Sequence, residues 1–369
     1  MIEVREVKTS RDLSVFIKLP FGIYKNDPFY SPELIRDQRV HFSQKNPFLR
    51  QSEVRFFIAY RGSKAAARAS LIINPVHNRY HNENLCFFGF YEAEDDLEVA
   101  EALFNTLEEE ARKGGFTSLR GPMNFSTNEY CGFLCEGYSE PPILMTPYNP
   151  PYYNDHMQHL GYHKAKDLLA FIRDIPDELP EKIYRAARIA ERSGIRVRII
   201  EPKRLLDELK IFQRIYNEAW KDNWGFVPIS DEELIYMTKR LKPIVVPELN
   251  LIAEKNGEPV GFLGMMPDFN LVLRKMRGRL TPITLLKALF YHRRIKDLRL
   301  LLLGVRPEYR LRGVDALLFR EGFRAARRYR RVEFSWILED NLPVIRLVEM
   351  IGGRKYKVFR IYEKELKQS

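Results

Sequence analysis

One order of predicted elements occurs twice in this chain of 369 residues. Each half contains an opening strand, helices, a hairpin, a further strand, a helix, a strand, a helix and a closing strand. The copies also end alike, because Leu160-Gly161 and Ile351-Gly352 both end a helix just before a final strand. The length predicts two domains, and 45% hydrophobic residues suffice for two cores. We therefore expect two diverged copies of one α/β unit.

The boundary between the copies is predicted from a stretch rich in proline and acid. Asp174 to Pro180 contains two prolines and three acidic residues, and a helical pattern follows from Glu181 to Ser193. We predict a first domain at 1–173, a linker and connecting helix at 174–195, and a second domain at 196–369.

The sequence also excludes several classes of protein. No apolar run approaches the roughly 20 residues of a membrane span, and the first residues lack the apolar stretch of a signal peptide. Cys86, Cys131 and Cys135 are too few for a disulfide framework and have no metal-site spacing, so no metal is predicted. We expect a cytoplasmic protein without a transmembrane segment.

Positive charge is concentrated in one segment. The net charge is +11, and residues 271–332 contain 18 Lys or Arg and four acids. Such a segment indicates an anionic partner, which is a nucleic acid, a membrane surface or a phosphorylated cofactor. The segment lacks interleaved aromatic residues, which argues against nucleic acid. A weak contact with a membrane surface remains open for the arginines of its last predicted helix, 314–329.

The sharpest motif lies between a buried strand, Leu298 to Val305, and that helix. The N–H groups at a helix start have no partner within the helix and favour an anion such as a diphosphate. Gly313 permits a close backbone approach, and Arg310 and Arg312 supply charged hydrogen-bond donors. A plain surface loop with arginines is an equally good interpretation of these residues alone.

This motif resembles the pyrophosphate motif of the GNAT superfamily of acyl-CoA-dependent acyltransferases. Arg310-Leu311-Arg312-Gly313-Val314 matches it, and Asp340-Asn341 matches a second family signature. Asp315 replaces the last small residue of the motif, and Val348 stands where the family has a tyrosine general acid. The resemblance implies acetyl-CoA or a longer acyl-CoA, bound by Leu303, Gly304, Val305, Arg310, Leu311, Arg312, Gly313, Val314, Asp315, Ala316 and Asn341.

The resemblance further implies an N-acyltransferase in which an amine attacks the thioester directly. The backbone at 303–305 is expected to hold the thioester, and Asn341 to support the pantetheine or the leaving group. Glu333 is the candidate base by strand position. The amine acceptor is a small molecule or a peptide. Two alternatives remain, a non-catalytic acyl-CoA-binding module and a tandem aminoacyltransferase that uses aminoacyl-tRNA.

The first half resembles a degenerate copy, and the whole chain is similar to bacterial tandem GNAT proteins. This implies two domains, each with a mixed, mostly antiparallel sheet flanked by helices. Carboxylates at Glu92 to Asp96 stand at the expected phosphate position of the first half and would repel a diphosphate. One acyl-CoA site is therefore predicted, in the second half.

Two loops are candidates for binding the acceptor. Trp220 to Phe226 combines aromatic side chains with an asparagine, and the long segment Gly121 to Pro151 carries several polar groups. Packing into the core is the alternative for the first loop, and a self-packed cover is the alternative for the second. The predicted acceptor-binding residues are Trp220, Asn223, Trp224, Asn124, Asn128 and Tyr130.

Overall fold

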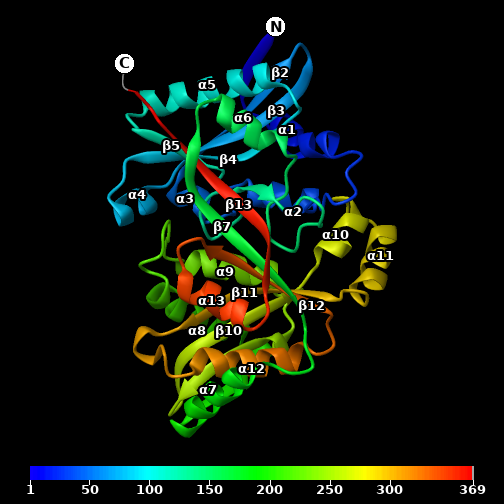
Figure 1. Cartoon of the computed structure of the whole chain (residues 1–369). Helices are drawn as coiled ribbons and strands as arrows, with labels where there is room; N and C mark the ends of the chain where they lie inside the picture. Colours follow the sequence, from blue (N-terminus) through cyan, green and yellow to red (C-terminus); the bar gives the residue numbers. More distant parts are fainter. Residues whose placement is uncertain (368–369) are drawn as a thin grey trace. The chain divides into compact units, whose positions relative to one another are not determined.

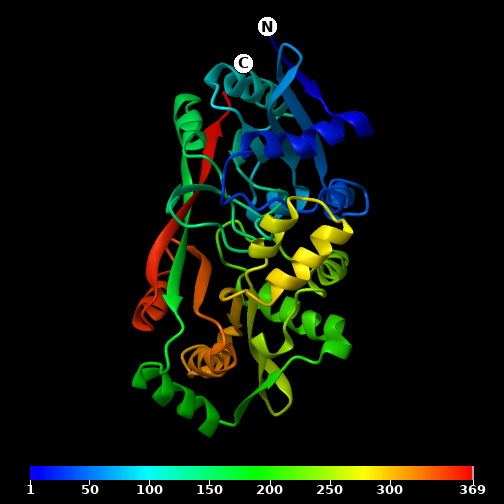
Figure 2. The ribbon, with the colours of Figure 1, turned by 90° about the vertical axis from the view of Figure 1, so that its right-hand side faces the viewer.

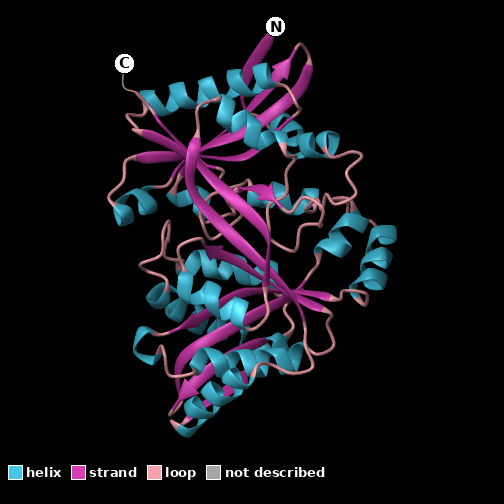
Figure 3. Ribbon diagram, viewed as in Figure 1, coloured by secondary structure: helices cyan, strands magenta, loops and turns pink. Residues whose placement is uncertain are grey.

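A computed structural model describes residues 1–367 and divides the chain into two compact units (Figure 1). The first unit comprises Met1–Leu168, Asn270–Phe290 and the C-terminal segment from Lys357, and the second comprises Leu169–Phe269 and Tyr291–Tyr356. These units differ from the predicted ranges. The first unit includes two segments from the predicted second domain, and the second unit begins at Leu169, within the predicted first domain. Both are α/β units with mixed, mostly antiparallel sheets and helices on both sheet faces, as expected (Figure 3).

The strands of the first unit follow the order β1-β2-β3-β4-β5-β13 across its sheet. The last of them, β13 (Arg354–Glu365), comes from the end of the chain. The other elements assigned to this unit are β1 (Ile2–Glu6), α1 (Ser10–Ile23), α2 (Ile35–His41), α3 (Phe48–Gln51), β2 (Glu53–Arg61), β3 (Lys64–Ile73), α4 (Pro75–His81), β4 (Leu85–Ala93), α5 (Leu97–Lys113), β5 (Ser118–Gly121), β6 (Phe133–Glu136), α6 (Tyr152–His159), α10 (Asn270–Met276) and α11 (Pro282–His292).

Alternation along β2 explains how this unit buries two faces of its sheet. Phe57 packs in a core with Leu103 and Leu107 of α5, whereas the neighbouring Phe56 contacts Phe16 of α1 on the other face. Successive side chains of a strand point to opposite faces, so the two phenylalanines bury one helix layer each. The sequence analysis missed β6, which lies in the segment 121–151 expected to be a loop, and it assigned no element to the residues of α10.

The second unit orders its strands β12-β11-β10-β9-β8, with the end of β7 (His163–Asp174) beside β12. Its other elements are α7 (Glu181–Arg192), β8 (Ile195–Ile199), η1 (Pro202–Arg204), α8 (Leu205–Ala219), α9 (Asp231–Leu241), η2 (Pro247–Leu249), β9 (Asn250–Lys255), β10 (Glu258–Pro267), β11 (Asp297–Val305), η3 (Pro307–Tyr309), α12 (Val314–Ala326), β12 (Arg331–Leu338) and α13 (Leu342–Met350).

Helices also cover both faces of the second sheet. Leu263 packs in a core with side chains of α7 and α12, and the adjacent Phe262 packs with Phe212 of α8 on the opposite face. β9 and β10 meet at Asn256-Gly257, both with positive φ, which is the turn chemistry that the sequence predicts.

β11 pairs in parallel with β12, and β4 pairs in parallel with β5, each over a short stretch. β11 pairs with β12 from Asp297 to Leu300 only, although β11 continues to Val305. β4 pairs with β5 from Leu85 to Phe87 only, although β4 continues to Ala93. Beyond these residues β11 and β12 diverge, because both strands continue without pairing, whereas β5 ends at Gly121 and leaves the rest of β4 without this partner.

The closing strand of the first unit is β13, which pairs antiparallel with β5 from Tyr362–Gly121 to Glu365–Ser118. The sequence analysis assigned the strand at 164–172 to close the first copy and the strand at 356–363 to close the second. Both strands carry apolar residues, and neither pattern indicates a partner, so the edge that each one joins is decided by long-range pairing rather than by local pattern.

Candidate functional site

The divergence of β11 from β12 leaves one side of β11 without a strand partner. Leu303, Gly304 and Val305 pair with β10 on the other side, and β12 has no register partner for them. The pairing with β10 shifts at Gly264/Met265, which leaves Leu301 as the extra residue of a bulge. The leucines at 301–303 are only half-buried, although they lie in the middle of a sheet. An open apolar edge of backbone therefore leads to the end of β11.

The loop after β11 carries two cations with no carboxylate partner. Arg306 pairs with Glu218, Glu258 and Glu308 and fixes the loop. Arg310 donates to the carbonyl of Ala219 over 2.7 Å, and the Arg312 guanidinium lies over the Tyr309 ring. Both side chains are exposed, and neither forms an ion pair within residues 1–367.

The start of α12 is not capped by the N-cap side chain. Gly313 is its N-cap residue, with φ of 77°. The Asp315 carboxylate accepts a hydrogen bond from the Ala316 N–H at 2.9 Å. The Ala316 N–H could otherwise bind a phosphate oxygen, but it is already bound by the Asp315 carboxylate.

Gly313 has a structural role that the sequence analysis missed. A Cβ at this position would lie 2.1 Å from the carbonyl oxygen of Ala186 in α7, and the positive φ also favours glycine. The sequence analysis expected a diphosphate to approach the backbone closely at Gly313. In the structure, helix α7 makes this close approach. A bulky residue here disturbs packing within the unit before any ligand is considered.

Asn341 lies at the end of β12, at the edge of the sheet where β11 also ends. It is the N-cap residue of α13 and is half-buried, and its N–H donates to the carbonyl of Leu338 at 2.9 Å. β11 and β12 are parallel neighbours, so their carboxyl ends share an edge. Val348, at the family's tyrosine position, is 1% exposed and belongs to the core.

Glu333 is held in a buried polar cluster. It is 0% exposed, and its carboxylate accepts hydrogen bonds from the hydroxyls of Ser335 and Tyr356. Burial and the charge of Glu333 raise the pKa of Tyr356 far above its usual value. Arg299, the register partner of Glu333, donates to the Ser335 carbonyl at 3.2 Å. The carboxylate proposed as a base therefore already accepts hydrogen bonds from two side chains of the protein.

The sequence analysis missed Ser335 and Tyr356 as partners of Glu333. Alternation along β12 places Glu333 and Ser335 on one face, which is a signal present in the sequence. The contribution of Tyr356 comes from a strand distant in sequence, and no local pattern indicates it.

The aromatic loop between α8 and α9 lies next to the arginine loop. Trp220 follows Ala219, whose carbonyl accepts from Arg310. The Trp220 ring centroid is 4.5 Å from that of Tyr216, and the Asn223 N–H donates to the Trp220 carbonyl at 2.9 Å. Trp220, Asn223 and Trp224 are all half-buried. They belong to the same unit as the open edge of β11.

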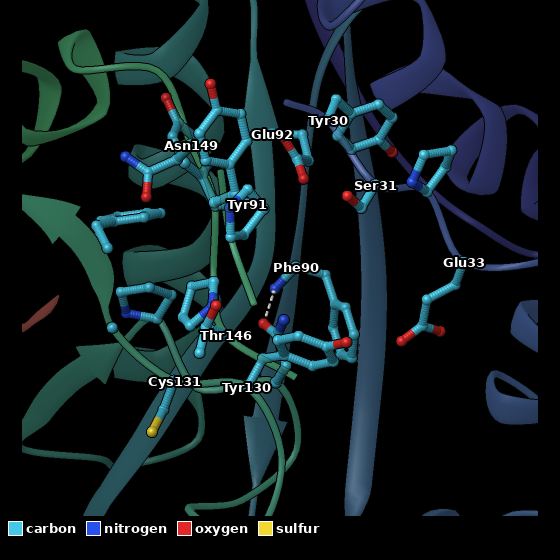
Figure 4. A pocket seen from close by; sticks show the side chains of 18 of the residues that line it. Tyr30, Ser31, Glu33, Phe90, Tyr91, Glu92, Tyr130, Cys131, Thr146 and Asn149 are labelled. Atoms are coloured by element: carbon cyan, nitrogen blue, oxygen red, sulfur yellow. Dashed lines mark hydrogen bonds between the residues drawn. The ribbon is translucent and has the colours of Figure 1, made fainter. Parts of the chain in front are cut away.

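In the first unit, the chain itself fills the corresponding divergence. After β5, the Met123 N–H donates to the carbonyl of Phe88 at 2.8 Å, and the Asn124 side chain accepts from the Phe90 N–H at 2.7 Å (Figure 4). A Cβ on Gly89 would lie 2.1 Å from the Met123 carbonyl oxygen, which shows how closely the loop approaches β4. The edge of β4 that corresponds to the open edge of β11 is therefore occupied by the loop after β5.

Beside this filled edge lies a cavity of about 150 Å³ (Figure 4). Asn124 and Tyr130 line it, whereas Asn128 does not. Glu92 also lines the cavity and accepts from the hydroxyls of Tyr24 at 2.7 Å and Tyr153 at 2.9 Å. Burial raises the pKa of Glu92, against the opposing effect of Arg68 at 3.9 Å.

The phosphate position expected in the first half differs in detail from the prediction. Glu92 belongs to β4 and not to the loop before α5. Asp96 is the N-cap residue of α5, accepts from the Val99 N–H at 3.2 Å and forms an ion pair with Arg61. The start of α5 is therefore already satisfied by a carboxylate of the chain.

Several comparisons with known proteins identify the same family. The sequence profile described as Acetyltransferase (GNAT) family matches residues 209–352. Protein YghO of Escherichia coli (strain K12) is 32% identical, over 98% of this chain and 95% of that protein. A protein named Bacterial ceramide synthase, from Caulobacter vibrioides (strain NA1000 / CB15N), is also 32% identical, over 99% of this chain and 98% of that protein.

Two solved structures share the fold at low sequence identity. A tandem GNAT protein from the clavulanic acid biosynthesis pathway has a TM-score of 0.58 and 13% identity and covers 100% of both chains. A GCN5-related N-acetyltransferase from Sphaerobacter thermophilus has a TM-score of 0.53 and 16% identity and covers 99% of this chain and 96% of its own. The chain therefore belongs to the acetyltransferase (GNAT) family and has a tandem GNAT fold.

Proposed function

We propose that this protein is an N-acyltransferase that moves an acyl group from acyl-CoA to the amine of a long-chain amino alcohol. The observation that carries the proposal is the 32% identity, over 99% of the chain, to a protein named Bacterial ceramide synthase. A ceramide is the amide of a fatty acid and a long-chain amino alcohol. The acceptor class is therefore narrower than the small-molecule or peptide amines suggested by the sequence.

The second unit supports binding of the acyl donor. Arg310 and Arg312 offer charged donors at the start of α12, where the Gly313 N-cap supplies no side-chain oxygen. This donor set fits a diphosphate, and Asp315 is the one group there that opposes it. The half-buried leucines at 301–303 offer apolar contact to an acyl chain and exclude water.

The reaction forms one bond and breaks another. The amine nitrogen attacks the thioester carbonyl carbon, the new C–N bond forms, the C–S bond breaks, and the proton of the amine leaves as the sulfur gains one. The backbone at 303–305 orients the thioester, and Asn341 supports the leaving group. Because Glu333 is bound to Ser335 and Tyr356, we assign proton removal to water at the open edge of β11.

The experiment offers the purified protein acyl-CoAs of 2 to 18 carbons with three acceptors, which are a long-chain amino alcohol, a polyamine and a lysine peptide. Release of the CoA thiol and the mass of the amide are measured, with Arg312→Ala as the variant and Arg324→Ala, which changes an exposed arginine of α12, as its control. We expect amide formation with the long-chain amino alcohol and a loss in Arg312→Ala only.

Three outcomes would contradict the proposal. Acylation of the peptide or polyamine alone would identify a different acceptor. Acyl-CoA binding without thiol release would favour a non-catalytic module. Binding of tRNA without acyl-CoA would favour the aminoacyltransferase alternative.

A further inference from the structure

Helix α11 presents its apolar side to solvent. Ile283, Leu286, Leu289 and Phe290 recur at helical spacing, and each is more than half exposed, with Ile283 and Leu286 at 68%. Thr284 and Ala288, on the other side of the helix, are half-buried. A helix of a globular protein normally packs its apolar side on the core. This helix does the reverse, and Leu280 and Leu285 enlarge the exposed patch.

The chain around this patch is strongly basic. Residues 270–296 contain eight Lys or Arg and no Asp or Glu. The exposed cations among them are Lys275, Arg277, Arg279, Lys287, Arg293, Arg294 and Lys296. An apolar patch bordered by cations, with no carboxylate in the segment, matches the interfacial region of a bilayer that contains anionic lipid.

The patch has a firm base in the first unit. The Ile35 N–H donates to the Gly278 carbonyl at 2.9 Å, and the Asn270 side chain donates to the Pro142 carbonyl at 3.0 Å. Val272 and Met276 of α10 are buried. Figures 1 and 2 show α10 and α11 in yellow, side by side. The segment that leads into α11 is therefore anchored in the first unit.

We propose that α11 and its flanking cations dock the protein onto the surface of an anionic membrane, with the helix in the plane of the interface. Its 11 residues span about 16 Å, roughly half of a hydrocarbon core of about 30 Å, so the helix lies on the bilayer and does not cross it. Within residues 1–367, no helix is long and apolar enough to cross a membrane.

Charge distinguishes this partner from two others. A second copy would bring the same cations against the patch, which disfavours self-association through α11. A nucleic acid would pair with the cations but would leave the exposed aliphatic side chains without a partner, because base stacking needs aromatic rings. An anionic bilayer satisfies both the cations and the apolar side chains.

The inference stands without the proposed function, since it concerns binding and not turnover. It also bears on that function, because docking brings the protein to the compartment in which long-chain amino alcohols reside.

The test measures co-sedimentation with vesicles of phosphatidylglycerol and phosphatidylcholine, against vesicles of phosphatidylcholine alone. The variant is Ile283→Gln with Leu286→Gln. The matched control is Ile189→Gln with Ile235→Gln, which changes two exposed isoleucines on other helices. We expect binding to the anionic vesicles, at least a tenfold loss in the α11 variant, no loss in the control, and weaker binding at high salt.

A second measurement reports insertion directly. In Phe290→Trp, the new indole should shift its emission to shorter wavelength when anionic vesicles are added. Equal binding of the α11 variant and the control would overturn the proposal, as would no binding by the parent. A dimer that the α11 variant abolishes, without vesicle binding, would also overturn it and identify the patch as a self-interface. Turnover of short soluble substrates by the variant separates this test from that of the proposed function.

Discussion

The Met123 N–H donates to the Phe88 carbonyl over 2.8 Å, at a point of β4 where pairing with β5 has already ended. The loop after β5 therefore forms a hydrogen bond with the part of β4 that β5 leaves unpaired. The corresponding edge of β11, at Leu303 to Val305, has no strand partner on the β12 side. The two copies share the same sheet geometry but differ in whether that edge is free.

We expect one acyl-CoA to bind per chain, in the second unit. Calorimetry with CoA checks the stoichiometry, and Arg312→Ala should weaken that single event. Two equivalent sites would show that the loop around Met123 moves aside and would contradict the prediction.

Asp315→Ala should strengthen CoA binding by up to about tenfold, because it frees the Ala316 N–H and removes a negative charge near the expected diphosphate. The dissociation constant is measured beside that of Glu321→Ala, which removes a carboxylate farther along the same helix. An equal gain in both variants would indicate a general charge effect rather than a local one.

Arg312→Ala should weaken CoA binding by about tenfold to a hundredfold, since a charged hydrogen bond contributes roughly 1.5–3 kcal/mol. Arg310→Ala should have a larger effect, because it also removes the bond to Ala219 that holds the aromatic loop. Arg324→Ala is the control. Unchanged affinity in both loop variants would place the diphosphate elsewhere.

Gly313→Val should destabilise the second unit rather than act on binding alone. The new side chain would meet the Ala186 carbonyl, and overpacking typically costs about 1–3 kcal/mol. The left-handed backbone adds a further penalty of about 1 kcal/mol. Thermal melting followed by circular dichroism checks this expectation. An unchanged melting temperature would show that α7 yields without cost.

Glu92→Gln should change how stability depends on pH. Burial raises the pKa of Glu92 in the folded protein, so the folded state retains a proton that the unfolded state loses. The parent's stability relative to Glu92→Gln should therefore fall as the pH rises above about 4.5 and through the folded pKa. Urea midpoints between pH 4 and 8 measure this difference. Parallel curves would contradict the raised pKa.

Local signals predicted most elements because their causes are local. α9 begins at Asp231 because Ser230 and Glu233 form a reciprocal cap, which is a pattern visible in the sequence. The loop that carries Arg310 and Arg312 follows a buried strand and opens a helix, as its residue types indicate. Three features were not predicted. They are the sheet edge that β13 joins, the contact between Tyr356 and Glu333, and the loop that occupies the edge of β4. Each depends on residues far apart in sequence, which no local pattern brings together.

The assignment of β13 to the first unit and of the end of β7 to the second bears on how such a protein evolves. Two copies of a domain that fold separately can be deleted one at a time. Here deletion of the first half would remove a strand that the second unit needs, and truncation at the C-terminus would open the sheet of the first. The exchanged strands make each copy part of its sister's fold, so neither copy can be removed without disrupting the sheet of the other.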